Sequence, residues 1–596
     1  MAEKTYTPLP PWQRTDYCGA LRSSDAGREV ALFGWVNSRR DHGGLIFIDL
    51  RDREGIVQLV FNPAHNAAAH EVAGAVRSEF FLAAKGKVIR RAEGTVNTEL
   101  PTGEIEVAVT ECEVLNSSPP PPINIEEGET SAEDLRLKYR YLDLRRPEMQ
   151  RNIRQRHRAV KAVRDYLDEQ GFIEIETPIL FKSTPEGARD YLVPSRVNPG
   201  KFYALPQSPQ LLKQLLMVGG FDRYFQIARC FRDEDLRANR QPEFTQIDIE
   251  MTCPRPEDIM GVAEGMMASV YEKVLGIDVK PPFLRLRFAD AMERFGVDKP
   301  DLRFGMELKN LGAAFQGTSF KVFAEVLARG EGVYGIVVPG AHQLSRKDLD
   351  TMVDTLKARH QMGLAWIKAN PDGWQGPIGK YIGETEKNLA SKAADLKTGD
   401  TMLMVAGNPD KVRPILGDIR LQLGARFNLR ETGERKFVWV VDFPLFEFND
   451  EEKRLFSVNH PFTAPNPEDL AVMAEHPLKA RALAYDMVLN GEEMGGGSIR
   501  IHSRELQLKV LELLGLTREE ALDRFGFLIE ALTYGAPPHG GIAFGVDRLI
   551  MMLCGTESIR DVIAFPKTQK AVDLMSGAPS DVSPRQLKEL SIKVTQ

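Results

Sequence analysis

The sequence predicts a multidomain α+β protein, and three observations lead to that fold class. At 596 residues the chain is too long for one ordinary hydrophobic core, and about three or four domains are expected. Residues 28–115 have the pattern of short strands, whereas residues 171–300 mix strands and helices. Residues 301–430 then change in composition, with more Lys, Gly and Ala, before the mixed pattern returns at Phe437. We therefore expect a β domain, a mixed core in two parts, and a domain inserted between those parts.

Five alternating runs, separated by Gly- and Asp-rich turns, occupy the first part of the chain. They span Val30–Val36, Leu45–Leu50, Ile56–Phe61, Phe80–Ile89 and Glu104–Val109. Five strands in about ninety residues suit a small closed barrel such as the oligonucleotide-binding (OB) fold. A generic small β domain is the alternative that the pattern leaves open. We place this domain at residues 1–118.

A proline-rich and then acidic stretch, Ser117–Thr130, predicts a stiff hinge, and we assign residues 119–148 to it. From Arg136 to Arg164, nine arginines and two lysines stand against only two acids. These cations form either a solvated helix face or a patch that faces phosphates. An amphipathic helix is predicted in the same stretch by residues at helical spacing, which are Ile153, His157, Val160, Val163 and Leu167.

Composition indicates a soluble globular protein, with 43% hydrophobic and 27% charged residues and a formal net charge of −7. No apolar run is long enough to span a membrane, and the N-terminus lacks the pattern of a signal peptide. The five cysteines are scattered and form no CxxC pair. We therefore expect a cytoplasmic protein that binds no structural zinc and no membrane.

The strongest chemical motif spans Tyr224–Met251, where two alternating strands flank a long polar loop. In the second strand Ile247, Ile249 and Met251 share one face, and the other face carries Phe244, Gln246, Asp248 and Glu250. A polar face of an antiparallel sheet can simply meet solvent. Arg232 and Glu234 at the start of the loop, with Arg237 and Arg240 inside it, instead favour a site for phosphate oxygens.

Two further motifs accompany it. Gly540–Met552 is a Gly-rich apolar strand that turns into an apolar helix, with Arg548 near the junction. A lone arginine there is usually a structural ion-pair partner, whereas Gly541 and Gly545 would let a flat ligand approach the backbone. Gly171–Pro178 predicts a helix end, a short strand and a proline suited to an interface.

These three motifs, in this order, resemble those of the class II aminoacyl-tRNA synthetases, and the sequence lacks a Walker or Rossmann phosphate loop. The resemblance implies an antiparallel-sheet catalytic core at residues 149–300 and 431–596, a dimer interface at the first motif, and ATP as substrate. It implies that Phe244 and Arg548 sandwich adenine and that Arg232 holds the α-phosphate, which makes Arg232 and Arg548 the catalytic residues. The implied ATP contacts are Arg232, Asp233, Glu234, Gln241, Phe244, Glu493, Gly545, Val546, Asp547 and Arg548.

Two other segments carry polar residues at regular spacing. Ser208 is a good N-cap and Pro209 a good first helical residue, which would place Gln210 and Lys213 on one helical face. Asp486 and Glu493 are seven residues apart and would share a face if a helix runs that far. They could then hold Mg²⁺ through oxygen ligands, although isolated acids are more often ordinary surface residues.

The strings SPQLLKQLLM, TPEGARDYLVPSR, RYLDLRRPEM and GGGSIRIH closely resemble bacterial-type aspartyl-tRNA synthetases over essentially the whole chain, including a GAD-like α/β insertion at residues 301–430. The resemblance implies a homodimer and an aspartate site made of Glu186, Gln210, Lys213, Arg232, Asp248, His460 and Arg500. A buried Arg500 beside Lys213 would offset its desolvation only when a carboxylate arrives, so a neutral asparagine would be rejected.

One position departs from the family pattern, because Asn459 stands where a first histidine often precedes His460-Pro461-Phe462. An asparaginyl- or lysyl-type synthetase is one alternative, and Arg500 with Lys213 disfavours it. A catalytically dead RNA-binding relative should have lost Arg232, Glu234, Glu493 or Arg548, and all four are present. A tRNA-independent asparagine synthetase is disfavoured by the barrel and the basic hinge.

The resemblance also implies that Arg40, Phe47 and Gln58 read the anticodon, with Phe47 as a stacking platform. Taken alone, a phenylalanine in this strand is more typical of the core. Enzymes that charge only the aspartate tRNA commonly carry a leucine and a lysine where this chain has His42 and Gly94. This pair resembles non-discriminating enzymes, although both can be incidental turn residues. We therefore expect tRNA(Asp) and also tRNA(Asn) as partners.

Overall fold

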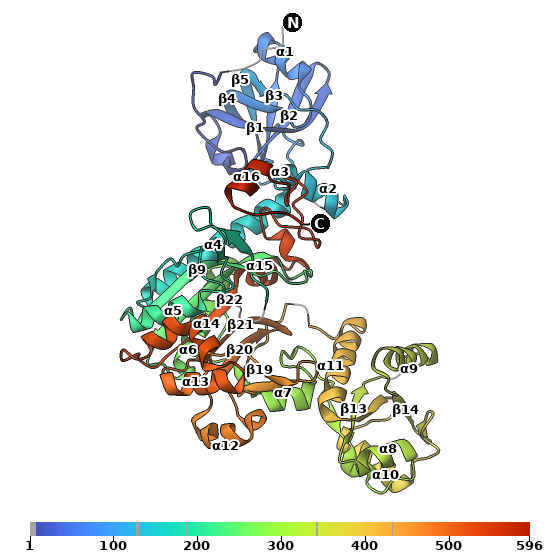
Figure 1. Ribbon diagram of the computed structural model, residues 1–596. Helices are drawn as coiled ribbons and strands as arrows, with labels where there is room; N and C mark the ends of the chain where they lie inside the picture. Colours follow the sequence, from blue (N-terminus) through green and yellow to red (C-terminus); the bar gives the residue numbers. More distant parts are fainter. Residues whose placement is uncertain are drawn as a thin grey trace. The chain divides into compact units, whose positions relative to one another are not determined.

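The computed structural model describes residues 8–126, 128, 130–184, 188–340, 344–431 and 433–595. The chain divides into two compact units, one formed by Met1–Arg154 with Arg560–Ser580 and the other by Gln155–Ile559 with Asp581–Gln596 (Figure 1). The division falls inside helix α4 (Pro147–Glu169). Within the described residues, none of the helices is long and apolar enough to cross a membrane. All five cysteines are free.

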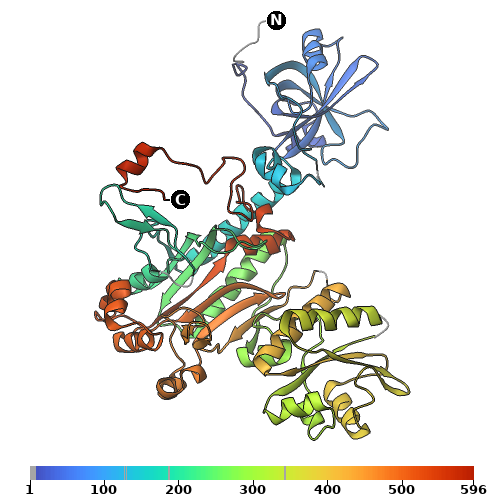
Figure 2. The same cartoon turned by 45° about the vertical axis from the view of Figure 1, so that its right-hand side comes forward.

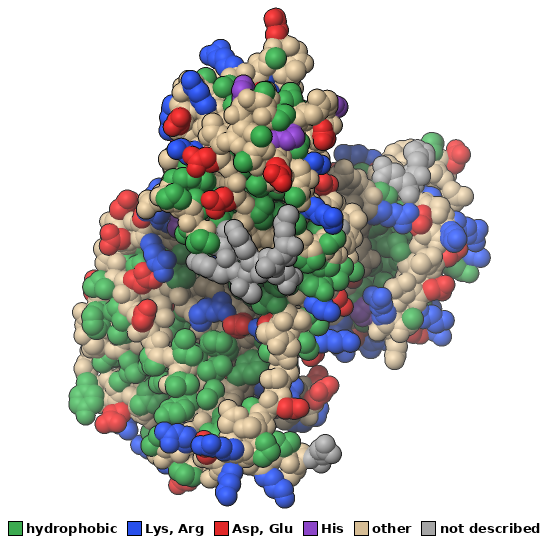
Figure 3. All heavy atoms as spheres, turned by 90° about the horizontal axis from the view of Figure 1, so that it is seen from above, with side chains coloured by type: hydrophobic (Ala, Val, Ile, Leu, Met, Phe, Trp, Pro, Cys, Tyr) green, Lys and Arg blue, Asp and Glu red, His purple; other side chains and the backbone are tan. Residues whose placement is uncertain are grey.

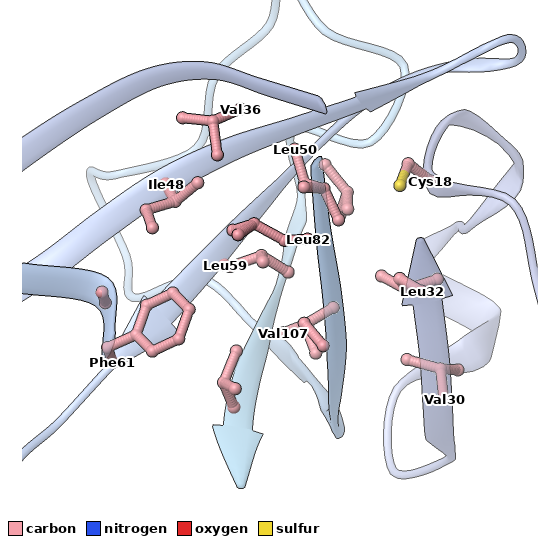
Figure 4. Close-up of a cluster of buried hydrophobic side chains, with 14 of the residues drawn as sticks. Cys18, Val30, Leu32, Val36, Ile48, Leu50, Leu59, Phe61, Leu82 and Val107 are labelled. Atoms are coloured by element: carbon pink, nitrogen blue, oxygen red, sulfur yellow. The ribbon is translucent and has the colours of Figure 1, made fainter. Parts of the chain in front are cut away.

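The first unit contains a closed five-stranded barrel, as the alternating runs predict. Its strand order is β1-β2-β3-β5-β4. The inward residues of every strand form one apolar core, where Val36, Ile48, Leu59 and Phe61 converge (Figure 4). The strands are β1 (Glu29–His42), β2 (Leu45–Asp52), β3 (Gly55–Phe61), β4 (Phe81–Arg90) and β5 (Ile105–Asn116), with α1 (Ala67–Ala75) beside them.

The alternation along β2 places its two sets of side chains on opposite faces. Ile46, Ile48 and Leu50 are fully buried, whereas Phe47 and Asp49 are only half-buried. The expectation that Phe47, taken alone, belongs to the core is therefore wrong. Because side chains alternate with a period of two, Phe47 lies on the outer face of the barrel.

The basic stretch after the barrel forms α2 (Glu133–Lys138), α3 (Arg140–Asp143) and the start of α4. Its arginines are largely paired within the first unit. Asp143, which is fully buried, lies 2.5 Å from Arg140 and 3.1 Å from Arg146. Arg145 pairs with Glu79 at 3.0 Å. These ion pairs link the segment to itself and to the barrel, so part of its positive charge is already paired.

The second unit is built on an eight-stranded sheet in the order β11-β17-β20-β21-β22-β10-β9-β6. The pairs β11–β17 and β6–β9 at the two edges are parallel, and all pairs between them are antiparallel. The strands are β6 (Ile173–Glu174), β9 (Arg223–Phe231), β10 (Glu243–Thr252), β11 (Leu284–Arg287), β17 (Phe437–Val441), β20 (Ala484–Leu489), β21 (Glu492–Ile499) and β22 (His539–Gly545). Two small hairpins accompany them, β7 (Leu192–Pro194) with β8 (Phe202–Ala204) and β18 (Phe446–Asn449) with β19 (Arg454–Ser457).

The helices of the second unit outside the insertion pack on this sheet or follow it in the chain. They are α4, α5 (Gln210–Val218), α6 (Pro256–Leu275), α7 (Phe288–Phe295), α12 (Leu470–Glu475), α13 (Arg504–Leu513), α14 (Arg518–Ala531), α15 (Val546–Cys554) and α16 (Pro584–Glu589). The predicted amphipathic helix is confirmed in α4, where Val163 and Leu167 are fully buried. His157 is exposed, because the buried face runs through Asn152, Ala159 and Ala162 instead.

The insertion is a three-layer α/β structure, which Figures 1 and 2 show as a sheet between helices. Its sheet order is β12-β13-β16-β14-β15. Helices α9 and α11 share one apolar cluster with the sheet, and α8 and α10 share another. The elements are β12 (Lys309–Asn310), α8 (Lys321–Ala328), β13 (Gly332–Val338), α9 (Arg346–His360), β14 (Ala365–Asn370), β15 (Gly373–Gln375), α10 (Glu384–Ala394), β16 (Thr401–Gly407) and α11 (Pro409–Arg426).

Side chains of both charges are interspersed over the face drawn in Figure 3, and hydrophobic side chains gather on part of it. Several large apolar residues of the second unit are exposed. They include Ile179, Leu180, Leu192, Val197 and Phe202, each between 46% and 76% exposed.

Candidate active site

A cavity of about 630 Å³ lies in the second unit. This volume suits a small-molecule ligand, since such sites span roughly 300–1,000 Å³. Fourteen of the residues selected from the sequence line it, namely Gln210, Lys213, Arg232, Glu234, Gln241, Phe244, Asp248, His460, Asp486, Glu493, Arg500, Gly545, Asp547 and Arg548.

Strand β10 supplies the floor of this cavity through its alternation. Ile247 and Ile249 are 1% exposed and pack into the core, while Phe244, Gln246 and Asp248 face the cavity. The polar face predicted for this strand thus lines the cavity. Strand β10 is an inner strand of the sheet, because β9 and β22 pair with its two edges.

Four buried charged groups meet at one end of the cavity, and we name them the charged quartet: Lys213, Asp248, Glu250 and Arg500. Lys213 Nζ lies 2.6 Å from Asp248 Oδ1 and 3.3 Å from Glu250 Oε2. Arg500 donates to both Glu250 oxygens, each at 3.0 Å. All four side chains are at most 2% exposed. Bidentate pairing of this kind fixes the direction of a guanidinium group.

The quartet corrects the expectation that Arg500 and Lys213 wait for a carboxylate to offset their desolvation. Both cations already have carboxylate partners, and the formal charges of the quartet sum to zero. Burial raises the pKa of Asp248 above its usual value. Burial also opposes ionisation of Glu250, but the Arg500 and Lys213 cations outweigh it and hold the pKa of Glu250 below its usual value.

His460 extends the quartet toward the cavity. Arg500 Nη1 donates to His460 Nε2 at 2.7 Å and to Ser498 Oγ at 2.6 Å. Burial and the neighbouring cations Arg500 and Lys213 lower the pKa of His460 well below its usual value. The imidazole is therefore neutral near pH 7, and its Nε2 serves as an acceptor for Arg500.

An aromatic ring and two arginines occupy the other end of the cavity. The guanidinium carbon of Arg232 lies 5.0 Å from the centre of the Phe244 ring. Arg548 donates from Nη1 to the backbone carbonyl of Glu493. The Nε groups of Arg232 and Arg548 are buried without a hydrogen-bond partner, as is Nε2 of Gln210. Buried donors without partners are costly, so these groups suit an anionic and polar ligand.

Asp486 and Glu493 are brought together, but not by the shared helix face expected from their spacing. They lie on the antiparallel hairpin of β20 and β21, which turns at Asn490-Gly491. A Cβ atom at Gly496 would lie 2.5 Å from Asp486 Oδ1 and 3.8 Å from Glu493 Oε1, so both carboxylates reach over this glycine. Burial, Glu493 and Asp298 raise the pKa of Asp486 well above its usual value.

These carboxylates fit a hard divalent cation, which prefers oxygen ligands and tolerates ligands from a substrate. Two protein carboxylates with a third, Asp298, on the cavity wall leave room for phosphate oxygens. Among the described residues, no group of three or more His, Cys, Asp or Glu side chains is arranged to hold a metal ion by itself.

The surroundings of three selected residues, Asp233, Val546 and Asp547, differ from those expected. Asp233 is exposed and Val546 is 1% exposed in the core, and neither lines the cavity. Glu186 lies outside the described residues. Asp547 lines the cavity, but its carboxylate binds Arg156 at 2.5 Å and the backbone N–H of Thr245 at 3.0 Å.

Gly541 also has a different role from the one expected. A Cβ atom there would lie 2.1 Å from Glu250 Oε2 and 2.0 Å from the carbonyl of Ile249. The missing side chain therefore makes room for the Glu250 carboxylate and not for a ligand. Gly545 lines the cavity, as expected.

Helix α5 begins one residue later than predicted, at Gln210, and Pro209 takes the N-cap position expected for Ser208. The Ser208 hydroxyl still accepts from the backbone N–H of Gln210 at 3.3 Å, so it satisfies an N-terminal donor. Gln210 and Lys213 share the buried face of α5, as predicted.

Three site residues were missed by the sequence reasoning: Glu250 as the partner of Arg500, Ser498 beside it, and Asp298 on the cavity wall. Glu250 sits on the predicted polar face of β10, two residues from Asp248, and that spacing was the available signal. Ser498 follows the glycine run by one residue. Asp298 carries no local signal, because only the tertiary fold brings it to the cavity.

The outer face of the barrel carries a polar network. Arg40 Nη2 donates to Asp49 at 3.0 Å and to Gln58 Oε1 at 3.2 Å, and Gln58 Nε2 donates to Glu106 at 2.8 Å. Phe47 is the direct strand neighbour of Arg40. An aromatic ring beside an arginine and an amide is typical of surfaces that bind unstacked bases.

His42 and Gly94 lie at turns of the barrel. His42 is exposed and pairs with Leu45 across the β1–β2 turn. Gly94 lies in the segment between β4 and β5, with φ of 83° and no atom within 4 Å of an added Cβ. Its left-handed backbone therefore favours glycine independently of any ligand.

The sequence matches two family descriptions. Residues 132–569 match "tRNA synthetases class II (D, K and N)", and residues 30–115 match "OB-fold nucleic acid binding domain". The chain is 55% identical to an aspartate–tRNA(Asp/Asn) ligase of Caldanaerobacter subterraneus subsp. tengcongensis, over 98% of each chain. It is 54% identical to the enzyme of the same name from Geotalea uraniireducens, over 98% of this chain and 99% of that one.

Solved structures share the fold. An asparaginyl-tRNA synthetase from Pyrococcus horikoshii complexed with asparaginyl-adenylate aligns with a TM-score of 0.59 and 20% identity, over 93% of this chain and 98% of that one. An aspartyl-tRNA synthetase from Entamoeba histolytica aligns with a TM-score of 0.56 and 18% identity, over 91% of this chain and 89% of that one.

Proposed function

The chain belongs to the class II tRNA synthetases (D, K and N) and, within them, to the aspartate–tRNA(Asp/Asn) ligases; on this premise we propose how its residues activate aspartate and which tRNAs it charges. Its activity is the ATP-dependent attachment of aspartate to tRNA. The observation that carries the residue assignments is one cavity that is lined by Lys213, Asp248 and Arg500 of the charged quartet and also by Phe244, Arg232 and Arg548.

Aspartate binds at the quartet. Its ammonium group binds Asp248 with Gln210 beside it, and this draws Asp248 away from Lys213. Lys213 and Arg500 then bind the side-chain carboxylate of the substrate, with His460 as a neighbour. Glu250 holds Arg500 in place throughout. The side-chain carboxylate of aspartate replaces Asp248 as an anionic partner of Lys213, whereas an asparagine amide leaves the buried Lys213 with the more distant Glu250, at 3.3 Å.

ATP binds at the opposite end. Adenine lies between Phe244 and Arg548, which requires Arg232 to leave its place over the Phe244 ring and turn to the α-phosphate. The carboxylates Asp486 and Glu493 would hold Mg²⁺, which would neutralise phosphate charge when bound. Glu234 and Gln241 complete the contacts to the nucleotide. Asp233 and Val546 do not line the cavity, so they support this site through the backbone. Asp547 supports it through its ion pair with Arg156.

The chemistry needs no protein nucleophile. The α-carboxylate oxygen of aspartate attacks the α-phosphorus, the bond from phosphorus to the bridging oxygen breaks, and pyrophosphate leaves. A terminal hydroxyl of the tRNA then attacks the carbonyl carbon of the mixed anhydride, and AMP leaves. Arg232 and Arg548 place the reacting atoms and stabilise the charge that develops on the phosphate.

The outer face of the barrel binds the anticodon. Phe47 stacks on an unstacked base, and Arg40 and Gln58 contact base edges and phosphates. This assignment is supported by the outward position of Phe47 and by the network that fixes Arg40 and Gln58 beside it.

The enzyme charges tRNA(Asp) and tRNA(Asn). Support comes from the names of its relatives and from His42 and Gly94, which leave the barrel without the leucine and lysine of enzymes that charge one tRNA. Charging of both transcripts under the same conditions tests this. We expect kcat/KM values for the two within about tenfold, and a preference beyond about a thousandfold, roughly 4 kcal/mol, would contradict dual specificity.

Gly94 provides a matched pair of variants for the same assay. Gly94→Ala and Gly94→Lys impose the same strain at a φ of 83°, but only lysine adds a long cationic side chain. Gly94→Lys, alone and in combination with His42→Leu, should lower charging of tRNA(Asn) relative to tRNA(Asp). Gly94→Ala should leave the ratio of the two rates unchanged. An equal shift of the ratio in both variants would assign the effect to the turn itself.

The protein forms a homodimer through the segment around β6. Support comes from the exposed apolar side chains of this segment, including Ile173 at 50%, Ile179 at 46% and Leu180 at 51%. Such residues mark an interface when they lie close together in one segment.

A further inference from the structure

The hairpin that carries Asp486 and Glu493 turns tightly at Asn490-Gly491. Two residues connect Leu489 to its partner Glu492, with φ of 54° at Asn490 and 89° at Gly491. Two successive left-handed residues define a type I′ turn, which matches the twist of the paired strands. Glu493 lies two residues beyond this turn, so the position of the turn fixes the start of the strand that carries it.

The segment between α11 and β17, which contains Glu434 and Lys436 and which we call the returning connection of the insertion, binds this turn from one side. Asn490 Nδ2 donates to the carbonyl of Glu434 at 2.8 Å, and Asn490 Oδ1 accepts from the backbone N–H of Lys436 at 2.9 Å. The backbone N–H of Asn490 also donates to the carbonyl of Lys436 at 3.3 Å. One side chain thus satisfies a donor and an acceptor of the segment that leads from the insertion into β17.

The segment between α7 and β12, which contains Asp298 and Asp301 and which we call the leading connection of the insertion, contacts the same turn from the other side. A Cβ atom at Gly491 would lie 3.2 Å from Cβ of Asp301, so the turn packs against that residue. Asp301 is 1% exposed and binds Arg303 at 2.6 Å, with Arg430 of the returning connection at 3.6 Å. Asp298, three residues earlier, lines the cavity.

Arg420 of α11 fastens the leading connection to the body of the insertion. It is fully buried and donates to the carbonyls of Asp301 at 2.9 Å, Phe304 at 2.7 Å and Gly305 at 3.0 Å. Its guanidinium carbon lies 4.1 Å from the centre of the Phe304 ring. Both connections and α11 therefore form one hydrogen-bonded assembly around the Asn490-Gly491 turn.

We propose that the two connections of the insertion clamp the Asn490-Gly491 turn and thereby hold Asp486 and Glu493 in register for the divalent cation of ATP. Asn490 and Asp301 are then positioning residues of the nucleotide site, although neither lines the cavity. The proposal rests on the proposed cation role of Asp486 and Glu493. Supports of this kind orient metal ligands, and their loss typically weakens metal binding without removing a ligand.

The variant Asn490→Gly isolates the clamp. Glycine keeps the left-handed backbone, so the turn persists, while both side-chain hydrogen bonds are lost. Asn449→Gly is the matched control, because Asn449 ends strand β18 in another hairpin and accepts from two backbone N–H groups within that hairpin. Asn490→Asp serves as a second variant, since it keeps the acceptor for Lys436 N–H and loses the donor to Glu434.

The experiment titrates the full-length protein with Mn²⁺ by electron paramagnetic resonance, in the presence of an ATP analogue whose α,β-bridge cannot be cleaved. We expect Asn490→Gly and Asn490→Asp to weaken Mn²⁺ binding by about tenfold or more. Aspartate binding, measured by calorimetry without nucleotide, should stay within about twofold of the parent value because the charged quartet is untouched. Asn449→Gly should change neither quantity.

The variant Glu493→Gln distinguishes a failure of the clamp from a failure of the proposed cation site. If this variant loses Mn²⁺ binding while Asn490→Gly and Asn490→Asp bind like the parent, the clamp is refuted and the cation site stands. If Glu493→Gln binds Mn²⁺ like the parent, the cation site itself is refuted, and the clamp with it. Equal losses in Asn490→Gly and Asn449→Gly would also refute the clamp, because a general weakening of hairpins would then explain them.

Discussion

The catalytic cavity and the outer face of the barrel use the same kinds of side chain in opposite settings. In the cavity, Arg500 and Glu250 are 2% and 0% exposed. On the barrel, Arg40 is 51% exposed and its partner Asp49 is 15% exposed. A buried pair is expensive to break because its survivor remains a desolvated charge, whereas an exposed pair is replaced by water. The Arg500–Glu250 pair is thus suited to one rigid arrangement, and the barrel face to a partner that rearranges it.

Breaking the buried pair should have the largest effect. Glu250→Gln leaves Arg500 buried without an anion, and we expect a loss of about 3–5 kcal/mol in the free energy of unfolding. Aspartate-dependent pyrophosphate exchange should also collapse, since Arg500 loses its fixed direction. Urea unfolding and exchange assays measure the two effects.

Asp49→Asn is the matched change on the barrel. It removes the charge that faces Arg40 and should cost less than about 1 kcal/mol in stability. Pyrophosphate exchange should be unaffected. A loss as large as that of Glu250→Gln would show that exposure does not separate the two pairs.

A smaller effect, confined to tRNA, tests the barrel face itself. Phe47→Leu keeps an apolar side chain but removes the stacking surface, and we expect tRNA charging to lose about 1–3 kcal/mol in kcat/KM. Exchange of pyrophosphate in the absence of tRNA should be unchanged, because Phe47 is not part of the core. A fall in stability would instead assign Phe47 to packing.

The sequence was sufficient where local periodicity decides the outcome. The five barrel strands and the two faces of β10 follow from alternation with a period of two, which needs no knowledge of the rest of the fold. Taken alone, the spacing of Asp486 and Glu493 predicts a helix face, and this prediction is wrong because the two residues lie on the hairpin of β20 and β21. The intervening Asn490-Gly491 is a strong signal for a two-residue turn, and it was available.

Ion pairs between residues far apart in the sequence cannot be predicted from local patterns. Glu250 and Arg500 are 250 positions apart, and they meet only because the sheet places β22 between β10 and β21. The same holds for the basic stretch after the barrel, where partners such as Glu79 turn apparent surface charge into internal ion pairs. Charge counts along a chain therefore say little about which cations remain free.

The most direct test of the account is pyrophosphate exchange with aspartate and with asparagine, using the full-length protein, ATP and Mg²⁺ without tRNA. The charged quartet predicts that aspartate is preferred by at least about a thousandfold in kcat/KM, roughly 4 kcal/mol, because the amide brings no anion to replace Asp248 beside the buried Lys213. Asparagine exchange within about tenfold of the aspartate rate, a difference of about 1.4 kcal/mol, would contradict the proposed role of the quartet.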